Sequence, residues 1–272
     1  MRVRHTAGMD PADRVTAGFV EAERRRALAV PHGEVVELDG IVMAFTNLRD
    51  ATLNGGVVHG MPADPARTVV AAGAAAEERG QPLGLEVERG RFPELEGALA
   101  AAGLSRLFTH PALTVDAAAM ERARRPSSLQ ITQVVDAAGL AAMAQVETEA
   151  FGTDPEVAEG LFSIGMVRDG ATRPFVGRMD GESVGQSIAT HHERAVGVFG
   201  VGVRVAMRRR GIGAAMTVIA ASAFPDADLI WLHPTTGART MYERLGFREV
   251  ALWDVWTRPR TDHPRGVPGA EP

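Results

Sequence analysis

The stretch Val203-Arg204-Val205-Ala206-Met207-Arg208-Arg209-Arg210-Gly211-Ile212-Gly213-Ala214 decides the fold of this chain. A valine-rich run ends in three arginines and a Gly-x-Gly, and an apolar-periodic segment follows. This pattern predicts a strand, a basic turn and the first turn of a helix. The first amides of a helix lack internal partners and lie at the positive end of the helix dipole, which suits phosphate. Glycines at 211 and 213 let a phosphate approach the main chain without meeting a Cβ atom.

The composition removes several functions for this turn. The 272-residue chain contains no cysteine and no lysine, so its 29 basic residues are all arginine. Without lysine the turn is not a Walker A loop, and neither Schiff-base nor thiol chemistry on the protein is available. The net charge of -5 argues against general binding to nucleic acid. No apolar run reaches the roughly 20 residues of a membrane helix, and the polar start lacks an apolar h-region. We expect a cytoplasmic protein without nucleic-acid or membrane partners.

The periodicity of apolar residues divides the chain into two halves. The first half reads as a helix over 11–29, a hairpin around Asp39-Gly40, a strand near 57–58, a helix over 65–79, a strand over 83–87, a helix over 93–102 and a strand near 108–115. The second half reads as a strand over 129–135, helices over 137–151 and 155–166, and antiparallel strands over 174–179, 183–190 and 195–205. A helix from 212, a strand over 229–232, a helix over 238–245 and a strand over 249–257 follow. The charged, Pro- and Ser-containing segment between the halves has the composition of a linker.

A second motif lies downstream of the arginine turn. The run Ala238-Arg239-Thr240-Met241-Tyr242-Glu243-Arg244-Leu245-Gly246-Phe247 fits an Ala-x-x-x-Tyr-x-x-x-Gly-Phe signature, and 208–214 fits Arg/Gln-x-x-Gly-x-Gly/Ala. In this order and element context, the second half resembles the GNAT superfamily of acyl-CoA-dependent N-acetyltransferases. Pro234-Thr235-Thr236-Gly237 replaces an asparagine that the family often carries early in the last helix. The end of the first half is similar to the C-terminal part of the same fold, but it has no arginine–glycine turn.

The resemblance implies an α/β (α+β) GNAT fold, with a mixed, mostly antiparallel sheet flanked by helices in tandem lobes. We expect a degenerate N-terminal lobe without a cofactor site at 1–118, a linker at 119–128, an acetyl-CoA-binding domain at 129–259 and a disordered tail at 260–272. By resemblance, the strand carrying Val201, Gly202 and Val203 separates from 229–232 and binds the acetyl and pantetheine arm. The amides of the turn take the pyrophosphate, which gives the cofactor-binding set Val201, Gly202, Val203, Arg208, Arg209, Arg210, Gly211, Ile212, Gly213 and Ala214. The alternative for Arg208–Arg210 is a solvated run of charge.

The resemblance also places Tyr242 where the family often protonates the departing CoA sulfur. Because Tyr242 shares a helix face with apolar residues, a core tyrosine is the alternative. The general base stays open among Glu147, His191, Glu193 and the adjacent His192, with a water relay equally suitable. The two histidines are neighbours on a strand and face opposite ways, and His-His-Glu has no metal-site spacing, so we predict no metal.

The functional expectation is transfer of an acetyl group from acetyl-CoA to a primary amine, by direct attack in a ternary complex. The acidic balance and the candidate carboxylates favour a small cationic amine over a nucleic-acid-bound protein as the acceptor, and a small molecule over a protein in general. The alternative is a non-catalytic acyl-CoA-binding sensor or assembly module, and transfer of a longer acyl group is a further enzyme reading. The sequence leaves the oligomeric state open, a homodimer included.

Overall fold

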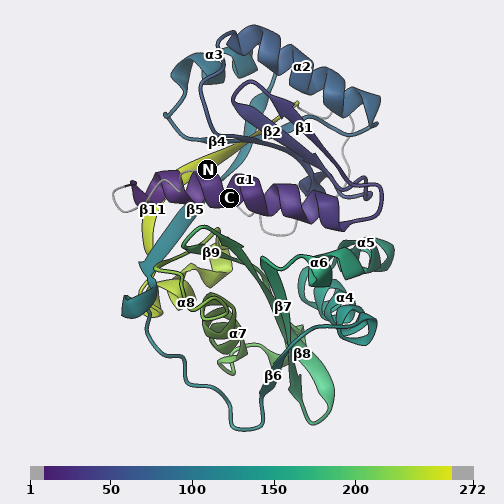
Figure 1. The fold of residues 1–272 in the computed structure, drawn as a ribbon, viewed down its shortest axis with the longest axis vertical. Coiled ribbons are helices and arrows are strands. Elements are labelled where there is room, and N and C mark those ends of the chain that lie inside the picture. The colour runs from purple at the N-terminus through teal and green to yellow at the C-terminus, as the bar shows by residue number, and fades with distance from the viewer. Residues whose placement is uncertain (1–8, 259–272) are drawn as a thin grey trace.

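The computed structural model describes residues 9–258 (Figure 1). Its strands are β1 (Glu34–Leu38), β2 (Ile41–Phe45), β3 (Asn54–Val58), β4 (Gly84–Glu88), β5 (Ser105–Asp116), β6 (Gln130–Gln133), β7 (Thr172–Met179), β8 (Glu182–His192), β9 (Ala195–Val203), β10 (Leu229–Leu232) and β11 (Arg248–Thr257). Its α-helices are α1 (Pro11–Ala29), α2 (Pro65–Glu78), α3 (Pro93–Ala101), α4 (Ala137–Phe151), α5 (Pro155–Leu161), α6 (Ile164–Arg168), α7 (Ile212–Ala221) and α8 (Arg239–Arg244). Short 3-10 turns lie at η1 (Ala51–Leu53), η2 (Ala117–Ala119), η3 (Val205–Met207) and η4 (Thr236–Ala238).

The strands form one 11-stranded sheet in the order β1-β2-β3-β4-β11-β5-β10-β9-β8-β7-β6. All neighbouring pairs are antiparallel except β3 with β4 and β9 with β10, which are parallel. Each parallel pair is joined through a helix, α2 in the first half and α7 in the second. The mixed, mostly antiparallel sheet flanked by helices is therefore confirmed, and so is its repetition in two lobes.

The two lobes are joined by an exchange of strands. Strand β11, from the end of the second half, lies between β4 and β5 of the first half. Strand β5 in turn lies between β11 and β10. Asp254 on β11 is fully buried, and Arg89, which follows β4, donates to both of its carboxylate oxygens at 2.6 to 3.2 Å. The sheet is thus continuous through the junction, and the lobe boundary at 119–128 stays a prediction.

Helix α1 lies across the junction between the lobes (Figure 1). Its bounds are those predicted, with Asp10 as the N-cap and proline at the first helical position. Phe19 packs edge-on against Trp231 of β10 and Trp253 of β11, with ring centroids 6.0 and 5.5 Å away. A Cβ atom on Gly18 would lie 2.8 Å from Trp231 Nε1, so glycine allows this close approach. The helix therefore holds strands from both halves under one apolar face.

The expected helix over 155–166 is wrong as a single element. The chain breaks at Phe162 and Ser163 into α5 and α6, and Ser163 adopts extended backbone angles. The Ser163 hydroxyl donates to the carbonyl of Ala29 at the end of α1. A Cβ atom on Gly165 would lie 2.2 Å from that same carbonyl oxygen. The break lets α6 pack against the end of α1, a tertiary contact that the periodicity of the segment does not encode.

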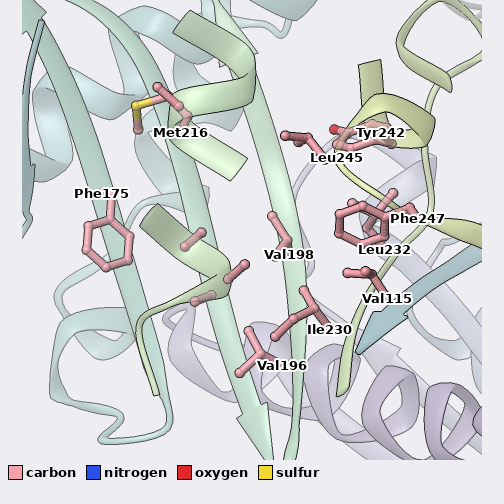
Figure 2. Close-up of a cluster of buried hydrophobic side chains, with 14 of the residues drawn as sticks. Val115, Phe175, Val196, Val198, Met216, Ile230, Leu232, Tyr242, Leu245 and Phe247 are labelled. Atoms are coloured by element: carbon pink, nitrogen blue, oxygen red, sulfur yellow. The ribbon is translucent and has the colours of Figure 1, made fainter. Parts of the chain in front are cut away.

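The core of the second lobe lies between its sheet and the helices α7 and α8. Figure 2 shows Tyr242, Leu245 and Phe247 gathered beside Ile230 and Leu232 of β10. Within residues 9–258, no helix combines the length and the apolar character needed to cross a membrane. The predicted disordered tail at 260–272 lies outside the described residues.

Candidate active site

Strands β9 and β10 separate at the centre of the second lobe. Their parallel register joins Leu229 to Ala195, Ile230 to Val196 and Trp231 to Gly197, and it goes no further. Strand β9 continues to Val203, paired only with β8 within the described residues, while β10 ends at Leu232. The second half of β9, including Val201 and Val203, therefore has main-chain groups on one edge that no strand pairs. Such an edge can pair with an extended, amide-containing chain.

A β-bulge lies in the unpaired part of β9. Gln186 faces Gly202 and Ile188 faces Phe199, so two steps along β8 correspond to three along β9. Gly200, inside the bulge, has φ of +54°, a conformation that favours glycine. A Cβ atom on Gly202 would lie 2.8 Å from the Phe151 ring of α4. The bulge turns main-chain groups at 200–201 out of the ladder, at the point where the two strands have separated.

The arginine turn follows directly at the end of β9. Arg209 and Gly211 both have positive φ, at +64° and +82°, and α7 begins at Ile212. Among residues 9–258 no side chain caps the N-terminus of α7, so the amides of its first turn have no capping partner there. Successive main-chain N–H groups in such a turn form an anion-binding concavity, supported by the helix dipole.

The three arginines of the turn have different roles. The Arg208 guanidinium donates to the carbonyls of Val203 at 3.2 Å and Ala150 at 2.6 Å, which holds the turn to β9 and to the end of α4. Arg209 and Arg210 are exposed and form no ion pair with any residue between 9 and 258. Two cations next to an uncapped helix N-terminus suit a diphosphate.

The matching helix of the first lobe has a different N-terminus. Helix α2 connects the parallel pair β3 and β4, as α7 connects β9 and β10. Its N-cap Asp64 accepts a hydrogen bond from the Arg67 amide, and Pro65 has no N–H to offer. Asp39, Asp64 and Arg67 are the charged residues that line a hollow beside this terminus. The Asp64 carboxylate therefore takes the hydrogen bond that this helix N-terminus would otherwise offer to an anion.

Tyr242 lies on α8, facing α7 across the core (Figure 2). It is 6% exposed, and burial raises the pKa of its hydroxyl to about 12, although a hydrogen bond with Thr217 of α7 opposes that rise. The Thr217 hydroxyl also donates to the carbonyl of Gly213 at 3.0 Å. Tyr242 is thus connected through Thr217 to the first turn of α7, and it remains protonated across the neutral pH range.

Glu147 lies on α4, opposite the bulged part of β9. Gln186 donates to one carboxylate oxygen through Nε2, and the Thr153 hydroxyl donates to the other at 3.2 Å. Burial raises the pKa of Glu147, the two hydrogen bonds oppose that rise, and the negative charge of Asp50 adds to it. Gln186 is fully buried, and its Oε1 has no hydrogen-bond partner among the residues that the structure describes. The group therefore offers hydrogen-bond acceptors and negative charge, which suit an amine.

The other candidate bases lie at the opposite end of β9. His191 and His192 pair with Val196 and Ala195 at the start of the strand, and Glu193 occupies the β8–β9 turn with φ of +52°. His191 stacks on Phe224 with ring centroids 4.6 Å apart, and burial lowers its pKa. Its Nε2 is 3.4 Å from Asp226 without forming a hydrogen bond. The structure brings Glu147 to the bulge and does not bring His191 or Glu193 there.

Sequence reasoning missed Gln186, Asp50 and a further polar group at the lobe junction. Gln186 is a polar residue at a buried position of β8. A polar residue inside the predicted strand over 183–190 was the signal that could have indicated it, because buried polar side chains need hydrogen-bond partners. Asp50 comes from the first half, and only the tertiary fold places it beside Glu147. The junction group consists of Glu86, His110 and His233.

The geometry defines a class of protein: a two-lobed α/β protein in which an arginine-rich turn and a helix N-terminus lie beside two parallel strands that separate. Residues 140–247 match the model of the acetyltransferase (GNAT) family. That segment forms a GNAT acetyltransferase domain, as the two motifs indicated.

Similar solved structures extend the likeness to the whole chain. A GCN5-related N-acetyltransferase from Kribbella flavida has 23% identity and a TM-score of 0.74, covering 93% of this chain and 97% of that one. One from Sphaerobacter thermophilus has 16% identity and a TM-score of 0.58, covering 82% and 79%. A tandem GNAT protein from the clavulanic acid biosynthesis pathway has 13% identity and a TM-score of 0.60, covering 92% and 97%. No curated protein matches the sequence. At these identities the structures share the fold, including its tandem form.

Proposed function

We propose that the second lobe transfers an acetyl group from acetyl-CoA to a primary amine of a small molecule, by direct attack in a ternary complex. The observation that carries this proposal is the uncapped N-terminus of α7 beside the separated strands, with the acceptor group of Glu147 and Gln186 on the facing helix and strand. The first is suited to the diphosphate of the donor, and the second to the amine.

Each chemical step has a residue suited to it. The amine nitrogen attacks the thioester carbonyl carbon, and Glu147 accepts its proton directly or through a water. The Gln186 side-chain amide donates to the Glu147 carboxylate and so holds it in position for this transfer. Main-chain N–H groups of the bulge stabilise the carbonyl oxygen as it gains charge. The C–S bond then breaks, and Tyr242 donates its proton to the leaving sulfur.

The charge around the acceptor site favours a cationic amine. Glu147 and Asp50 are close enough for the charge of Asp50 to raise the pKa of Glu147. A bound ammonium relieves that repulsion, whereas an acidic acceptor would add to it. This is why we propose a small basic amine, with no nucleic-acid or membrane partner and no metal in the transfer step. The first lobe, with a carboxylate at its helix terminus, is proposed to bind no CoA.

A thiol-release assay with a panel of primary amines tests the proposal. Turnover that depends on both acetyl-CoA and an amine, with the acetylated amine identified by mass spectrometry, is the expected result. Tight binding of acetyl-CoA with only slow hydrolysis and no accepted amine would instead support a non-catalytic acyl-CoA-binding module. Acetyl-CoA compared with longer acyl-CoA donors in the same assay defines the acyl chain.

A further inference from the structure

Three side chains that bind metals well meet at the lobe junction, away from the arginine turn. Glu86 comes from β4, His110 from β5 and His233 from the residue that follows β10. One ligand atom from each lies within 4.8 Å of the other two. His110 Nε2 is 2.8 Å from Glu86 Oε2, and the rings of His110 and His233 are 4.5 Å apart between centroids. The three residues are remote in sequence, and the exchange of strands brings them together.

Two imidazole nitrogens in this group have no partner. His110 Nδ1 and His233 Nε2 are both buried without a hydrogen bond among residues 9–258. A buried polar atom left unpaired costs about 1–3 kcal/mol, so two in one cluster are unusual for a purely structural arrangement. Within the described residues, His233 Nε2 is therefore a buried polar atom that an additional ligand would satisfy.

The surroundings carry excess negative charge. Glu23 on α1 adds a second carboxylate near Glu86. Arg26 forms an ion pair with Glu23. Within the described part of the chain, Glu86 has no cationic partner except His110, which is charged only when protonated. A divalent cation would neutralise both carboxylates. The side chains of His110 and Glu86 remain 14% and 30% exposed, which leaves a route for an ion to enter.

We propose that Glu86, His110 and His233 bind one divalent transition metal ion, of which Zn²⁺ is the best match. Two imidazole nitrogens and one carboxylate oxygen form a ligand set typical of zinc, with the fourth position left to water or to Glu23. The ion replaces the hydrogen bond between His110 and Glu86 and joins β4, β5 and β10 across the junction. It takes no part in the proposed acetyl transfer, so the two proposals fail independently.

The test uses the full-length protein stripped with EDTA and passed into metal-free buffer. Titration with Zn²⁺ in competition with a chromophoric chelator is expected to show one tight equivalent. The double variant His110→Ala/His233→Ala should bind about 100-fold more weakly, whereas the exposed His59→Ala variant should bind as the wild type does. Co²⁺ binding to the wild type should give the visible absorption bands of a four-coordinate site.

Two results would overturn this proposal. One is a correctly folded wild-type protein, judged by circular dichroism, that takes up no Zn²⁺ above the level of surface binding. The other is a double variant that binds as tightly as wild type. If the double variant does not fold, Glu86→Gln replaces it, because that side chain is partly exposed and its amide is a poor zinc ligand. Thermal unfolding gives a second readout: one equivalent of Zn²⁺ should raise the Tm of the wild type but not of the variant.

Discussion

Replacing Glu147 by glutamine separates catalysis from stability. The carboxylate accepts hydrogen bonds from Gln186 and Thr153, and a glutamine keeps the shape and an oxygen for the Gln186 amide. Its amide group faces the Thr153 hydroxyl, which can accept. What the substitution removes is the charge, and with it the ability to take a proton from an amine.

The expected effect on stability is small. Changing a charged acceptor to a neutral one weakens the hydrogen bonds by about 1 kcal/mol. Opposing this, burial and Asp50 raise the pKa of Glu147, so ionisation of the native protein is disfavoured. For an acid with a raised native pKa, stability falls as pH rises from the ordinary glutamate pKa to the raised one, and it stays lower above that range. Glu147→Gln removes this loss of stability, which offsets the weaker hydrogen bonds. The net change in the free energy of unfolding at neutral pH should therefore lie within about 1 kcal/mol.

The expected effect on turnover is large. A general base contributes about 10²- to 10⁴-fold, which corresponds to about 3–5 kcal/mol of transition-state stabilisation. The assay is initial-rate thiol release with the best amine found, together with urea unfolding of each protein. Glu149→Gln is the matched control, since Glu149 lies on the same helix, is exposed and pairs with Arg204 at 2.6 Å. Wild-type kcat/KM in Glu147→Gln would refute the assignment of the base, whatever its stability.

Three further predictions concern neighbouring parts of the structure. Tyr242→Phe should lower kcat about 10- to 100-fold and cost about 1 kcal/mol of stability from the lost hydrogen bond with Thr217, measured by initial rates and urea unfolding; unchanged kcat would leave Tyr242 as a core residue only. The value of kcat/KM should rise with pH as Glu147 ionises, at a pH above the ordinary glutamate pKa. Ionisation of Tyr242 should not lower kcat/KM until near pH 12. If Glu147→Gln has the same pH profile as the wild type, another group is responsible for the rise. Asp254→Ala should lower the free energy of unfolding by about 2 kcal/mol, because Arg89 and the Thr109 hydroxyl lose their buried acceptor. This loss is smaller than the loss for a fully buried ion pair, since the Arg89 side chain is 40% exposed. A loss of stability smaller than that from replacing an exposed aspartate would contradict this prediction.

Local structure followed closely from the sequence. Helix α1, strands β1 and β2 and strand β10 have the predicted bounds, because caps, turn dipeptides and apolar spacing act over a few residues. The same holds for the arginine turn, where strand, glycine and helix are adjacent in the chain. The break between α5 and α6 was not predictable in this way, since its cause is the carbonyl of Ala29.

Long-range pairing lay beyond the sequence. Strands β5 and β11 have ordinary strand patterns, and nothing in their residues specifies that each pairs with the other lobe. That exchange places His110 beside Glu86 and His233, and the packing of the lobes places Asp50 near Glu147. Residues that act together through such contacts carry no spacing signal in the chain. The candidate bases on the β8–β9 hairpin lie next to the strand that carries Val201 and Val203. The register places these bases at the start of that strand, away from its unpaired end.

Equilibrium binding of acetyl-CoA tests the central claim most directly. Titration calorimetry of the wild-type protein should show one site. The charge reversal Arg209→Glu/Arg210→Glu should weaken it by about 100-fold or more, since two phosphate contacts become repulsive. The control Arg67→Glu/Arg168→Glu changes the same charge at exposed positions elsewhere and should bind as wild type does. Wild-type affinity in the turn variant, or no binding to the wild-type protein at millimolar acetyl-CoA, would contradict the account.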